Sequence, residues 1–398
     1  MRVKDIAIIN KSACSKKRLP PEIYYLDTAS LTEGHIENVQ KFNKSKDKIP
    51  SRAQRKVEDK TILYSTVRPR QHHYGILNNP PSNLIVSTGF ATIDANTEFV
   101  DPYYLYYQLI SPKNSNYLAT IADTAVSSYP SIAPEDIGNI DVKLPNLDEQ
   151  KRVAGTIKCI DRKIEINKII SSRLESLARL IYDYWFVQFD FPDEYGRPYK
   201  SSGGKMVWNE DLKCEIPEGW VVKSLFDAAD VCYGIPLLTK NFTDSGLPVV
   251  RIRDILDNST SAFTCEQVDD KYLTHEGDLL VGMDGNFQMN YWYQTGDCVN
   301  QRIVRIRKKE IPVMLIRFQV EPHITAKVEN VARSTVGHLS DTDLKSLRIV
   351  VPEDLSILDG FDSYITQICL LGAENRQLTS LRDFLIPILM DDEKVTFK

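Results

Sequence analysis

Two long stretches of the chain place apolar residues at the three- and four-residue spacing of an amphipathic helix. Charged residues fill most of the positions between them, so each stretch predicts a helix with a narrow apolar stripe. The first runs from about Asp148 to Trp185, with apolar positions at Val153, Ile157, Ile160, Ile164, Ile170, Leu174, Leu177 and Ile181. The second runs from about Leu355 to Met390, with Leu358, Phe361, Ile365, Ile368, Leu371, Leu378, Leu381, Leu385 and Leu389.

A helix of this length would extend roughly 55 Å, which exceeds the width of a small domain. We expect the two helices to pair as an antiparallel coiled coil, with Asn167 and Asn375 near the contact stripe to fix the register. The simpler alternative is that each helix packs on its own domain. Pro387 lies in the last turn of the second helix, where proline should bend or end it.

The segments before the two helices repeat one another at low identity. SSYPSIAPEDIGNIDVKLP ends at Pro145 and STVGHLSDTDLKSLRIVVP ends at Pro352, an offset of 207. Ser128 then faces Thr335, and Asp136 faces Asp343; we expect both aspartates to cap short helices. A strand with alternating apolar residues should follow in each half, formed by Ile140, Val142 and Leu144 and by Leu347, Ile349 and Val351.

Three earlier segments match in the same order. VKDI (3–6) resembles VKSL (222–225), DKTILYSTVRP (59–69) resembles EGDLLVGMDG (276–285), and STGFATI (87–93) corresponds to NQRIVRI (300–306). The pattern predicts an α+β protein with an internal pseudo-twofold repeat of two mixed α/β domains. The expected segments are domain 1–146, helix 147–186, exposed connector 187–219, domain 220–352, helix 353–390 and tail 391–398.

Composition supports two folded domains, because 42% of the 398 residues are hydrophobic. The seven cysteines form no CxxC pair, which favours a reduced cytoplasmic protein over a disulfide or zinc scaffold. The N-terminus lacks the features of a secretory signal, and no apolar run approaches the ~20 residues of a membrane span. The net charge of −5 argues mildly against a nucleic-acid partner.

Motifs for catalysis are not apparent. NNPPSNL (78–84) resembles the Asn-Pro-Pro-aromatic motif of adenine methyltransferases, but Ser82 replaces the aromatic residue that stacks on the flipped base. The chain has no GxGxxG, GxxxxGK[ST], GxSxG or HExxH motif, and its six histidines lack metal-ligand spacing. We therefore expect a loop at 78–84, no catalytic residue and no metal site in this chain.

Polar and basic residues instead gather in loops that follow matching strands in both halves. Arg, Asn and Gln make bidentate contacts with guanine and adenine edges, so these loops are candidates for DNA binding. Any solvated loop would also be polar; the recurrence in both halves is what favours binding. The candidates are Arg68, Arg70, Gln71, His72, His73, Ser87 and Thr88 in the first half and Arg251, Arg253, Asn286, Gln288, Asn290, Trp292, Gln301 and Arg302 in the second.

An ordered set of motifs over nearly the whole chain resembles the specificity subunit of type I restriction–modification enzymes. The most specific is WFVQFDFP followed by GRPYKSSGG; others are LPNLDEQKRVAGTIKCIDRKIEIN, IPEGW, GDLLVGMDGNF and LRDFLIPILM. The resemblance implies two target-recognition domains, each recognising one half of a bipartite site in double-stranded DNA. It also implies two helices that pair antiparallel as a rigid spacer.

Such subunits have no activity of their own. The resemblance implies docking to methylation subunits, two in number, that carry S-adenosylmethionine, and to restriction subunits that translocate DNA with ATP and Mg²⁺. The residues expected in docking and helix pairing are Gln150, Val153, Ile157, Ile160, Ile164, Asn167, Leu174, Leu177, Ile365, Ile368, Asn375, Leu378 and Leu381.

The second helix departs from the family pattern. Ser356 and Ile357 replace the Glu149–Gln150 pair, and Gly360 and Gly372 each cost up to ~1 kcal/mol relative to alanine. This predicts unequal joints between helix and domain, and a second helix that bends. Two other functions are considered: a coiled-coil scaffold whose globular halves bind proteins, and an adenine methyltransferase suggested by the NPPS motif alone.

Overall fold

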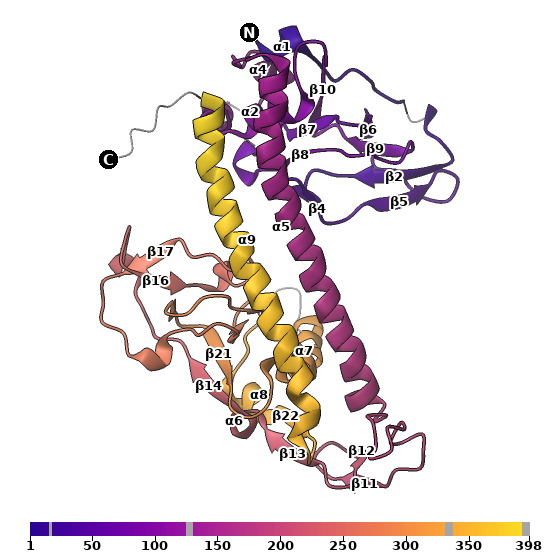
Figure 1. Cartoon of the computed structure of the whole chain (residues 1–398), viewed down its shortest axis with the longest axis vertical. Helices are drawn as coiled ribbons and strands as arrows, with labels where there is room; N and C mark the ends of the chain where they lie inside the picture. Colours follow the sequence, from indigo (N-terminus) through magenta and orange to yellow (C-terminus); the bar gives the residue numbers. More distant parts are fainter. Residues whose placement is uncertain (16–17, 125–129, 331–336, 392–398) are drawn as a thin grey trace. The chain divides into compact units, whose positions relative to one another are not determined.

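The structure, a computed structural model, describes residues 1–15, 18–124, 130–330 and 337–391 (Figure 1). The expected match of Ser128 with Thr335 and the tail residues 392–398 lie outside these ranges. The chain divides into a first unit, Met1–Ile164 with Leu378–Lys398, and a second unit, Glu165–Gln377. Two long helices, α5 (Leu147–Tyr182) and α9 (Asp359–Asp391), contribute residues to both units.

The first unit contains two four-stranded sheets. One is antiparallel, with the order β1 (Ala7–Ile9), β10 (Phe90–Ala95), β7 (Ile62–Ser65) and β8 (Tyr74–Ile76). The other has the order β5 (Gln40–Asn43), β2 (Glu22–Leu26), β9 (Leu84–Ser87) and β6 (Ala53–Lys56), with β2 and β9 parallel. The smaller elements are the hairpin β3 (Leu31–Thr32) and β4 (His35–Ile36) and the helices α1 (Val3–Ile6), α2 (Pro102–Ile110), α3 (Pro112–Thr124) and α4 (Pro134–Gly138).

The core of the first unit is built on both faces of β7 and β10. Ile62, Tyr64, Ala91 and Ile93 pack with residues of α2, while Leu63 and Phe90 face a second cluster with residues of β2 and β9. Burial on both faces explains why these strands show continuous apolar runs instead of alternation. The helices complete the first cluster with Val153 and Ile157 of α5 and Ile386 and Met390 of α9.

The second unit has two four-stranded sheets and two short strand pairs. Its antiparallel sheet has the order β14 (Ala229–Tyr233), β21 (Ile303–Lys308), β18 (Leu279–Gly282) and β19 (Met289–Tyr291). The other sheet has the order β15 (Phe242–Thr243), β17 (Ala262–Thr264), β16 (Leu247–Val250) and β20 (Cys298–Val299), with β16 and β20 parallel. The remaining elements include the antiparallel pair β13 (Val221–Ser224) and β22 (Arg348–Val351) and the helices α6 (Leu225–Ala228), α7 (Val313–Asn330) and α8 (Asp341–Ser346).

Two backbone hydrogen bonds of the first unit have counterparts in the second. Val3 N donates to Ile140 O at 3.0 Å, as Leu225 N does to Leu347 O at 3.2 Å. Ile132 N donates to Thr66 O at 2.9 Å, as Leu339 N does to Met283 O at 2.7 Å. The equivalent bonds make Leu225 the counterpart of Val3, where the expected match of VKDI with VKSL had placed Val222. That match is therefore wrong by three residues.

The strand expected after each short helix forms only in the second unit. β22 pairs with four residues of β13, whereas the segment after α4 forms the single bridge of Arg2 with Asp141. The two capping aspartates are confirmed. Asp136 accepts from Ala133 N and Asp343 accepts from Ser340 N, both at 2.7 Å, at the third position of α4 and α8.

Both long helices form, but their ends differ from the prediction. α5 ends at Tyr182 and continues as a π-helical turn, Asp183–Val187, while a 3₁₀ turn, Leu355–Leu358, precedes α9. α9 continues through Pro387 to Asp391, so Pro387 does not end it. Its two glycines differ in surroundings: a Cβ at Gly360 would meet no atom within 4 Å, whereas a Cβ at Gly372 would lie 2.3 Å from Cδ2 of Tyr293.

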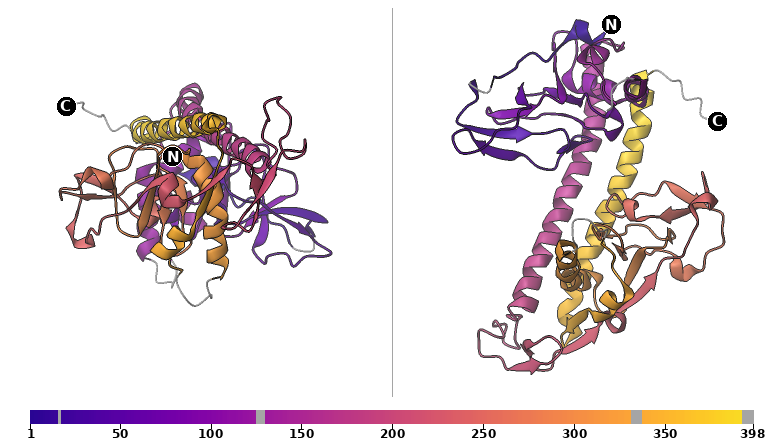
Figure 2. Two further views of the ribbon diagram at one scale, coloured as in Figure 1. Left: turned by 90° about the horizontal axis from the view of Figure 1, so that it is seen from below. Right: turned by 180° about the vertical axis from the view of Figure 1, so that it is seen from behind.

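The first half of α9 closes the core of the second unit (Figure 2). Phe361, Ile365 and Ile368 pack in one cluster with residues of β18, β21 and α7. A long helix therefore packs on the globular part in both units, which was the simpler alternative to helix pairing. In the first unit, Val153 and Ile157 of α5 make the corresponding core contacts. Each buried aliphatic side chain of this kind contributes about 1.5–3 kcal/mol.

The two joints between helix and globular part differ, as predicted. At the first, the buried Gln150 side chain donates to Phe99 O at 3.2 Å and to Pro145 O at 2.9 Å, and accepts from Asp101 N at 2.9 Å. At the second, Asp354 caps the 3₁₀ turn through Ser356 N at 2.9 Å, and Ile357 packs against the core. The side-chain amide of Gln150 thus makes its hydrogen bonds within its own unit. It is not available for docking to another subunit, contrary to expectation.

The connector is folded, which corrects the expectation of an exposed linker. It forms the hairpin β11 (Met206–Asn209) and β12 (Cys214–Pro217), and the rings of Phe189 and Phe191 lie 5.8 and 4.8 Å from that of Trp220. These aromatic side chains join the connector to the core of the second unit. Within the described residues, no helix has the length and apolar character that a membrane span requires.

Candidate nucleic-acid interface

The loop between β7 and β8 presents four of the predicted polar side chains to solvent. Arg68, Arg70, Gln71 and His72 are exposed on or beside a single 3₁₀ turn, Pro69–Gln71. Arg68 and His72 adopt the left-handed conformation, with φ of 49° and 55°, on either side of that turn. Non-glycine residues in this region carry strain that surrounding contacts must hold. Here Arg68 N donates to Pro130 O at 2.9 Å, which anchors the loop.

Two cations of this loop pair with carboxylates from elsewhere in the first unit. Arg70 donates from Nε and Nη2 to Oδ2 of Asp123 at 3.2 and 2.6 Å. His72 Nδ1 lies 3.0 Å from Oε1 of Glu33, and its ring stacks on Tyr74. The hydrogen bond to Glu33 raises the pKa of His72 above its ordinary value, against the opposing effect of burial. Neither carboxylate was among the residues predicted from the sequence.

The remaining candidates of the first half point inward or are partly covered. His73 Nδ1 lies 2.7 Å from Leu31 O, and Ser87 is buried with its Oγ accepting from Gly89 N at 3.1 Å. Thr88 is half-buried, and its backbone N donates to Arg52 O at 2.9 Å. The predicted loop is confirmed over 78–83, and Leu84 already begins β9. Ser87 is therefore withdrawn as a candidate, because its hydroxyl is enclosed.

The loop between β18 and β19 occupies the equivalent place in the second unit. Asn286 at its tip is exposed. The next residue, Phe287, has a buried side chain that anchors the loop, and its backbone φ is 46°. Asp284 lies at its base: Oδ1 is 2.8 Å from Nδ1 of His338 and Oδ2 is 3.8 Å from Nε of Arg302. Gln301 and Arg302, on the turn before β21, are exposed, as is Arg253.

Several candidates of the second half are structural. Trp292 is fully buried, and its Nε1 donates to Asp297 Oδ2 at 2.9 Å. Asn290 donates to Ile255 O and Leu256 O at 3.2 and 3.1 Å, and Gln288 is half-buried. Arg251 is held by Asp254 at 2.8 Å and by Ser261 at 2.6 Å, with its side chain only 16% exposed. We withdraw Trp292 and Arg251 because their polar groups face the protein.

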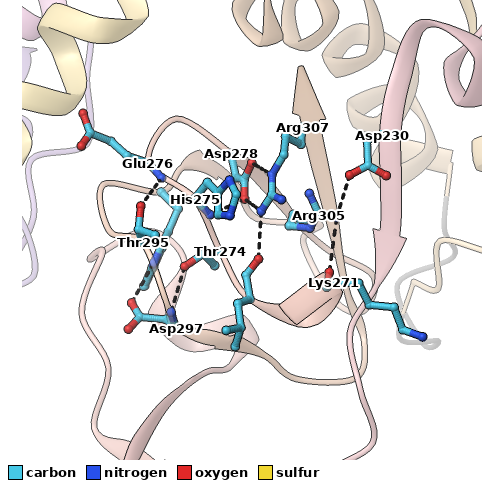
Figure 3. Close-up of polar contacts among 12 residues, drawn as sticks. Asp230, Lys271, Thr274, His275, Glu276, Asp278, Thr295, Asp297, Arg305 and Arg307 are labelled. Atoms are coloured by element: carbon cyan, nitrogen blue, oxygen red, sulfur yellow. Dashed lines mark hydrogen bonds and ion pairs between the residues drawn. The ribbon is translucent and has the colours of Figure 1, made fainter. Parts of the chain in front are cut away.

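A group of paired charges, two of them buried, stabilises the second unit (Figure 3). Arg307 donates to Asp278 twice at 2.8 Å and to Leu273 O at 2.9 Å. Arg305 donates to Asp230 at 2.9 Å. Arg305 and Asp278 have side chains 3% and 1% exposed, so their charges must be compensated inside the protein. Their role is to hold β21 against β14 and the start of β18.

The helix positions predicted for pairing divide into buried and exposed sets. Val153, Ile157, Ile164, Asn167, Ile365 and Ile368 are buried, and Ile160, Leu174, Asn375 and Leu378 are half-buried. Leu177 and Leu381 are each 45% exposed, which contradicts their expected place on the contact stripe. Their neighbours take the inner positions: Ala178 is fully buried, and Arg382 lies 3.4 Å from Asp161.

The sequence is similar to a known protein family and to individual members of it. The family described as the type I restriction modification DNA specificity domain matches residues 1–176 and 217–380. The chain is 23% identical over 448 residues to the type I restriction enzyme HindI specificity subunit of Haemophilus influenzae, covering 94% of each chain. It is 26% identical over 354 residues to the MjaIX specificity subunit of Methanocaldococcus jannaschii, covering 84% of this chain and 77% of that one.

The fold is also shared with a solved structure. The type I restriction-modification system S subunit from M. genitalium superimposes with a TM-score of 0.53 at 14% identity, covering 99% of this chain and 96% of that one. The family match alone accounts for most of the sequence. The chain therefore belongs to the type I restriction modification DNA specificity family.

Proposed function

We propose that this specificity subunit recognises a bipartite site in double-stranded DNA, with one globular domain for each half-site. The observation that supports this best is the recurrence of one sheet, in the same strand order, with a polar loop at the same place. The first loop follows β7 and presents Arg68 and Arg70; the second follows β18 and presents Asn286. Arginine and asparagine suit direct recognition of guanine and adenine edges in the major groove.

The two domains, 1–146 and 220–352, are related in this proposal by a pseudo-twofold repeat. Two pairs of equivalent hydrogen bonds support that relationship. Ile132 N donates to Thr66 O in the first domain, as Leu339 N donates to Met283 O in the second. Val3 N donates to Ile140 O, as Leu225 N donates to Leu347 O. Such a repeat would present two similar loops to two half-sites of different sequence, because the loop residues themselves differ.

The long helices act as the spacer between the half-sites. Asp161 of α5 contacts Arg382 of α9 at 3.4 Å in the first unit, and Asn167 of α5 contacts Asn375 of α9 at 2.9 Å in the second. Residue numbers rise along α5 as they fall along α9, which supports an antiparallel coiled coil. Insertion of a heptad near Lys163, with a matching heptad in α9, adds about 10 Å of helix, or about three base pairs of spacing.

An apolar face of α5 is the proposed docking surface for the methylation subunits. Ile166, Ile169, Ile170, Leu177 and Leu180 lie on one side of the helix at steps of three, four and seven residues, and are 36–66% exposed. Exposed apolar patches of this kind mark protein–protein contacts. The partner subunits would bring S-adenosylmethionine, with ATP and Mg²⁺ on the restriction subunits, and this chain would supply no catalytic residue.

The half-site assignment is tested by substituting one loop at a time. With the methylation subunits present, Arg68→Ala should change methylation of one half of the split motif, and Asn286→Ala should change the other. Methylated adenines are mapped by modification-sensitive sequencing of the host genome. Equal loss at both halves from either variant would refute one-domain-one-half recognition, and a protein scaffold would show no dependence of methylation on either residue.

A further inference from the structure

One exposed arginine in each unit, at or beside a candidate DNA-binding loop, is paired with a carboxylate of the same unit. In the first unit, Arg70 donates twice to Oδ2 of Asp123, at 3.2 and 2.6 Å. In the second unit, Asp284 lies 3.8 Å from Nε of Arg302. The positive charges of Arg70 and Arg302 are therefore offset, in a chain whose net charge is −5.

Each carboxylate is positioned by the fold. Asp123 lies in the last turn of α3, a helix that packs beside the 3₁₀ turn carrying Arg70. Asp284 lies in the loop itself, where its second oxygen is 2.8 Å from Nδ1 of His338 and where the backbone bridges residue 338. The helix that carries Asp123 and the side chain of Asp284 are thus each placed by contacts other than the arginine.

These pairs are accessible to a ligand. The side chains of Arg70 and Asp123 are 63% and 45% exposed, and those of Arg302 and Asp284 are 55% and 36% exposed. Exposed ion pairs contribute little to stability, so they are not explained by a need to hold the fold together. An uncharged hydrogen-bond acceptor can approach Arg70 from the side of Nη1, which makes no bond to Asp123.

The carboxylate affects base edges and phosphates differently. The O6 and N7 acceptors of guanine are uncharged overall, so they can bond to the open edge of Arg70 while Asp123 remains in place. A phosphate at the same position would bring a negative charge within a few ångströms of the carboxylate and be repelled. Sequence-independent binding depends on phosphate contacts, whereas specificity depends on base contacts.

We propose that Asp123 and Asp284 are specificity-determining residues, which hold Arg70 and Arg302 for base edges and suppress their contact with phosphates. The inference rests on the proposed function, because it assumes that these loops meet DNA. In the absence of the correct half-site the charges of Arg70 and Arg302 remain offset by Asp123 and Asp284, and non-cognate duplex is bound more weakly than it would be without these aspartates.

The test compares Asp123→Asn with wild type in the complex of the full chain with its methylation subunits. Fluorescence anisotropy is used with a non-cognate duplex and with the cognate duplex taken from the methylation map. Asp141→Asn is the matched control: it removes the same charge from an exposed residue of the same unit that forms no ion pair in the described part of the chain. Asp123→Glu keeps the charge and should behave as wild type.

For Asp123→Asn we expect about fivefold tighter binding to non-cognate duplex. The dependence of log affinity on log salt, measured between roughly 50 and 200 mM, should steepen by about one unit, as for one added phosphate contact. Cognate affinity should change less, so the ratio of cognate to non-cognate affinity falls. Asp284→Asn should have the same effect through Arg302.

The outcomes separate this inference from the proposed function. Wild-type preference for the cognate duplex, with Asp123→Asn indistinguishable from Asp141→Asn, would refute the role of Asp123 and leave DNA recognition intact. A wild-type complex with no preference for any sequence would overturn both. Thermal unfolding of each variant establishes that the comparison is made between folded proteins.

Discussion

Asn167 of α5 donates its side-chain amide to Oδ1 of Asn375 of α9 at 2.9 Å, and to Oε2 of Glu374 at 2.7 Å. Asn167 is fully buried, so this polar contact is shielded from water. A buried polar pair of this kind fixes the register of two helices, because a shifted alignment would leave its donors unpaired. It is the interaction that the asparagines on both apolar stripes predicted.

Replacement of Asn167 by alanine should therefore lower the free energy of unfolding by about 1–3 kcal/mol. The loss arises because Oε2 of Glu374 and Oδ1 of Asn375 each lose one hydrogen bond at a half-buried position. Chemical denaturation of the variant and wild type measures the change. Ser172→Ala, at an exposed position of the same helix, should alter stability by less than ~0.5 kcal/mol. An Asn167 variant as stable as this control would contradict the role given to the pair.

The two glycines of α9 provide a second, matched comparison. Gly360→Ala should stabilise the protein by up to ~1 kcal/mol, since helical propensity improves and an added Cβ meets no neighbour within 4 Å. Gly372→Ala should destabilise it by about 1–3 kcal/mol, because the same Cβ would lie 2.3 Å from the ring of Tyr293. Thermal unfolding distinguishes the signs. Two changes of the same sign would show that Tyr293 moves aside.

The ion pair of His72 with Glu33 makes a prediction about pH. The hydrogen bond to Glu33 raises the pKa of His72 above 6.5, so the pair stabilises the protonated form in the folded chain. Its contribution to stability is complete below 6.5 and is lost as the pH rises through the higher folded pKa. Glu33→Gln should lower the pKa of His72, as followed by NMR of the imidazole ring. Glu37→Gln, at a nearby exposed glutamate, should not, and equal effects would contradict this assignment.

The exposed apolar face of α5 should govern partner binding without affecting the fold. Ile170→Glu and Leu180→Glu should each weaken binding of the methylation subunit by more than about tenfold, because each removes a buried aliphatic contact. Stability of the isolated chain should be unchanged, since both side chains are exposed. Ser172→Glu adds the same charge on another side of the helix and serves as the control. Equal binding by all three variants, measured by calorimetry, would place the docking surface elsewhere.

The long-period features of this fold could be predicted from sequence, and the contacts across the fold could not. The apolar period of both helices extends over many turns and identifies them, and the polar loops after β7 and β18 were predicted from the similar segments 59–69 and 276–285. The inward face of each helix was harder to assign, because the small Ala178 and the charged Arg382 take positions where Leu177 and Leu381 were expected.

The partners of the loop cations have no local signal. Asp123 lies 53 residues from Arg70, and Glu33 lies 39 residues from His72, so only the tertiary fold brings them together. Trp292 was misassigned for a related reason: it lies in a polar run, yet Asp297 satisfies its indole N–H and allows full burial. The connector was expected to be an exposed linker because its sequence is rich in turn residues, yet Phe189 and Phe191 within it pack on Trp220.

The central claim is that this chain determines which DNA site the methylation subunits modify. The most direct test is sequencing of methylated adenines in the host genome with the gene present and with it deleted, while the methylation subunit is co-expressed in both strains. We predict that one split motif loses methylation in the deletion strain and regains it when the wild-type chain is restored. Methylation of every motif at the same level in both strains would contradict the claim.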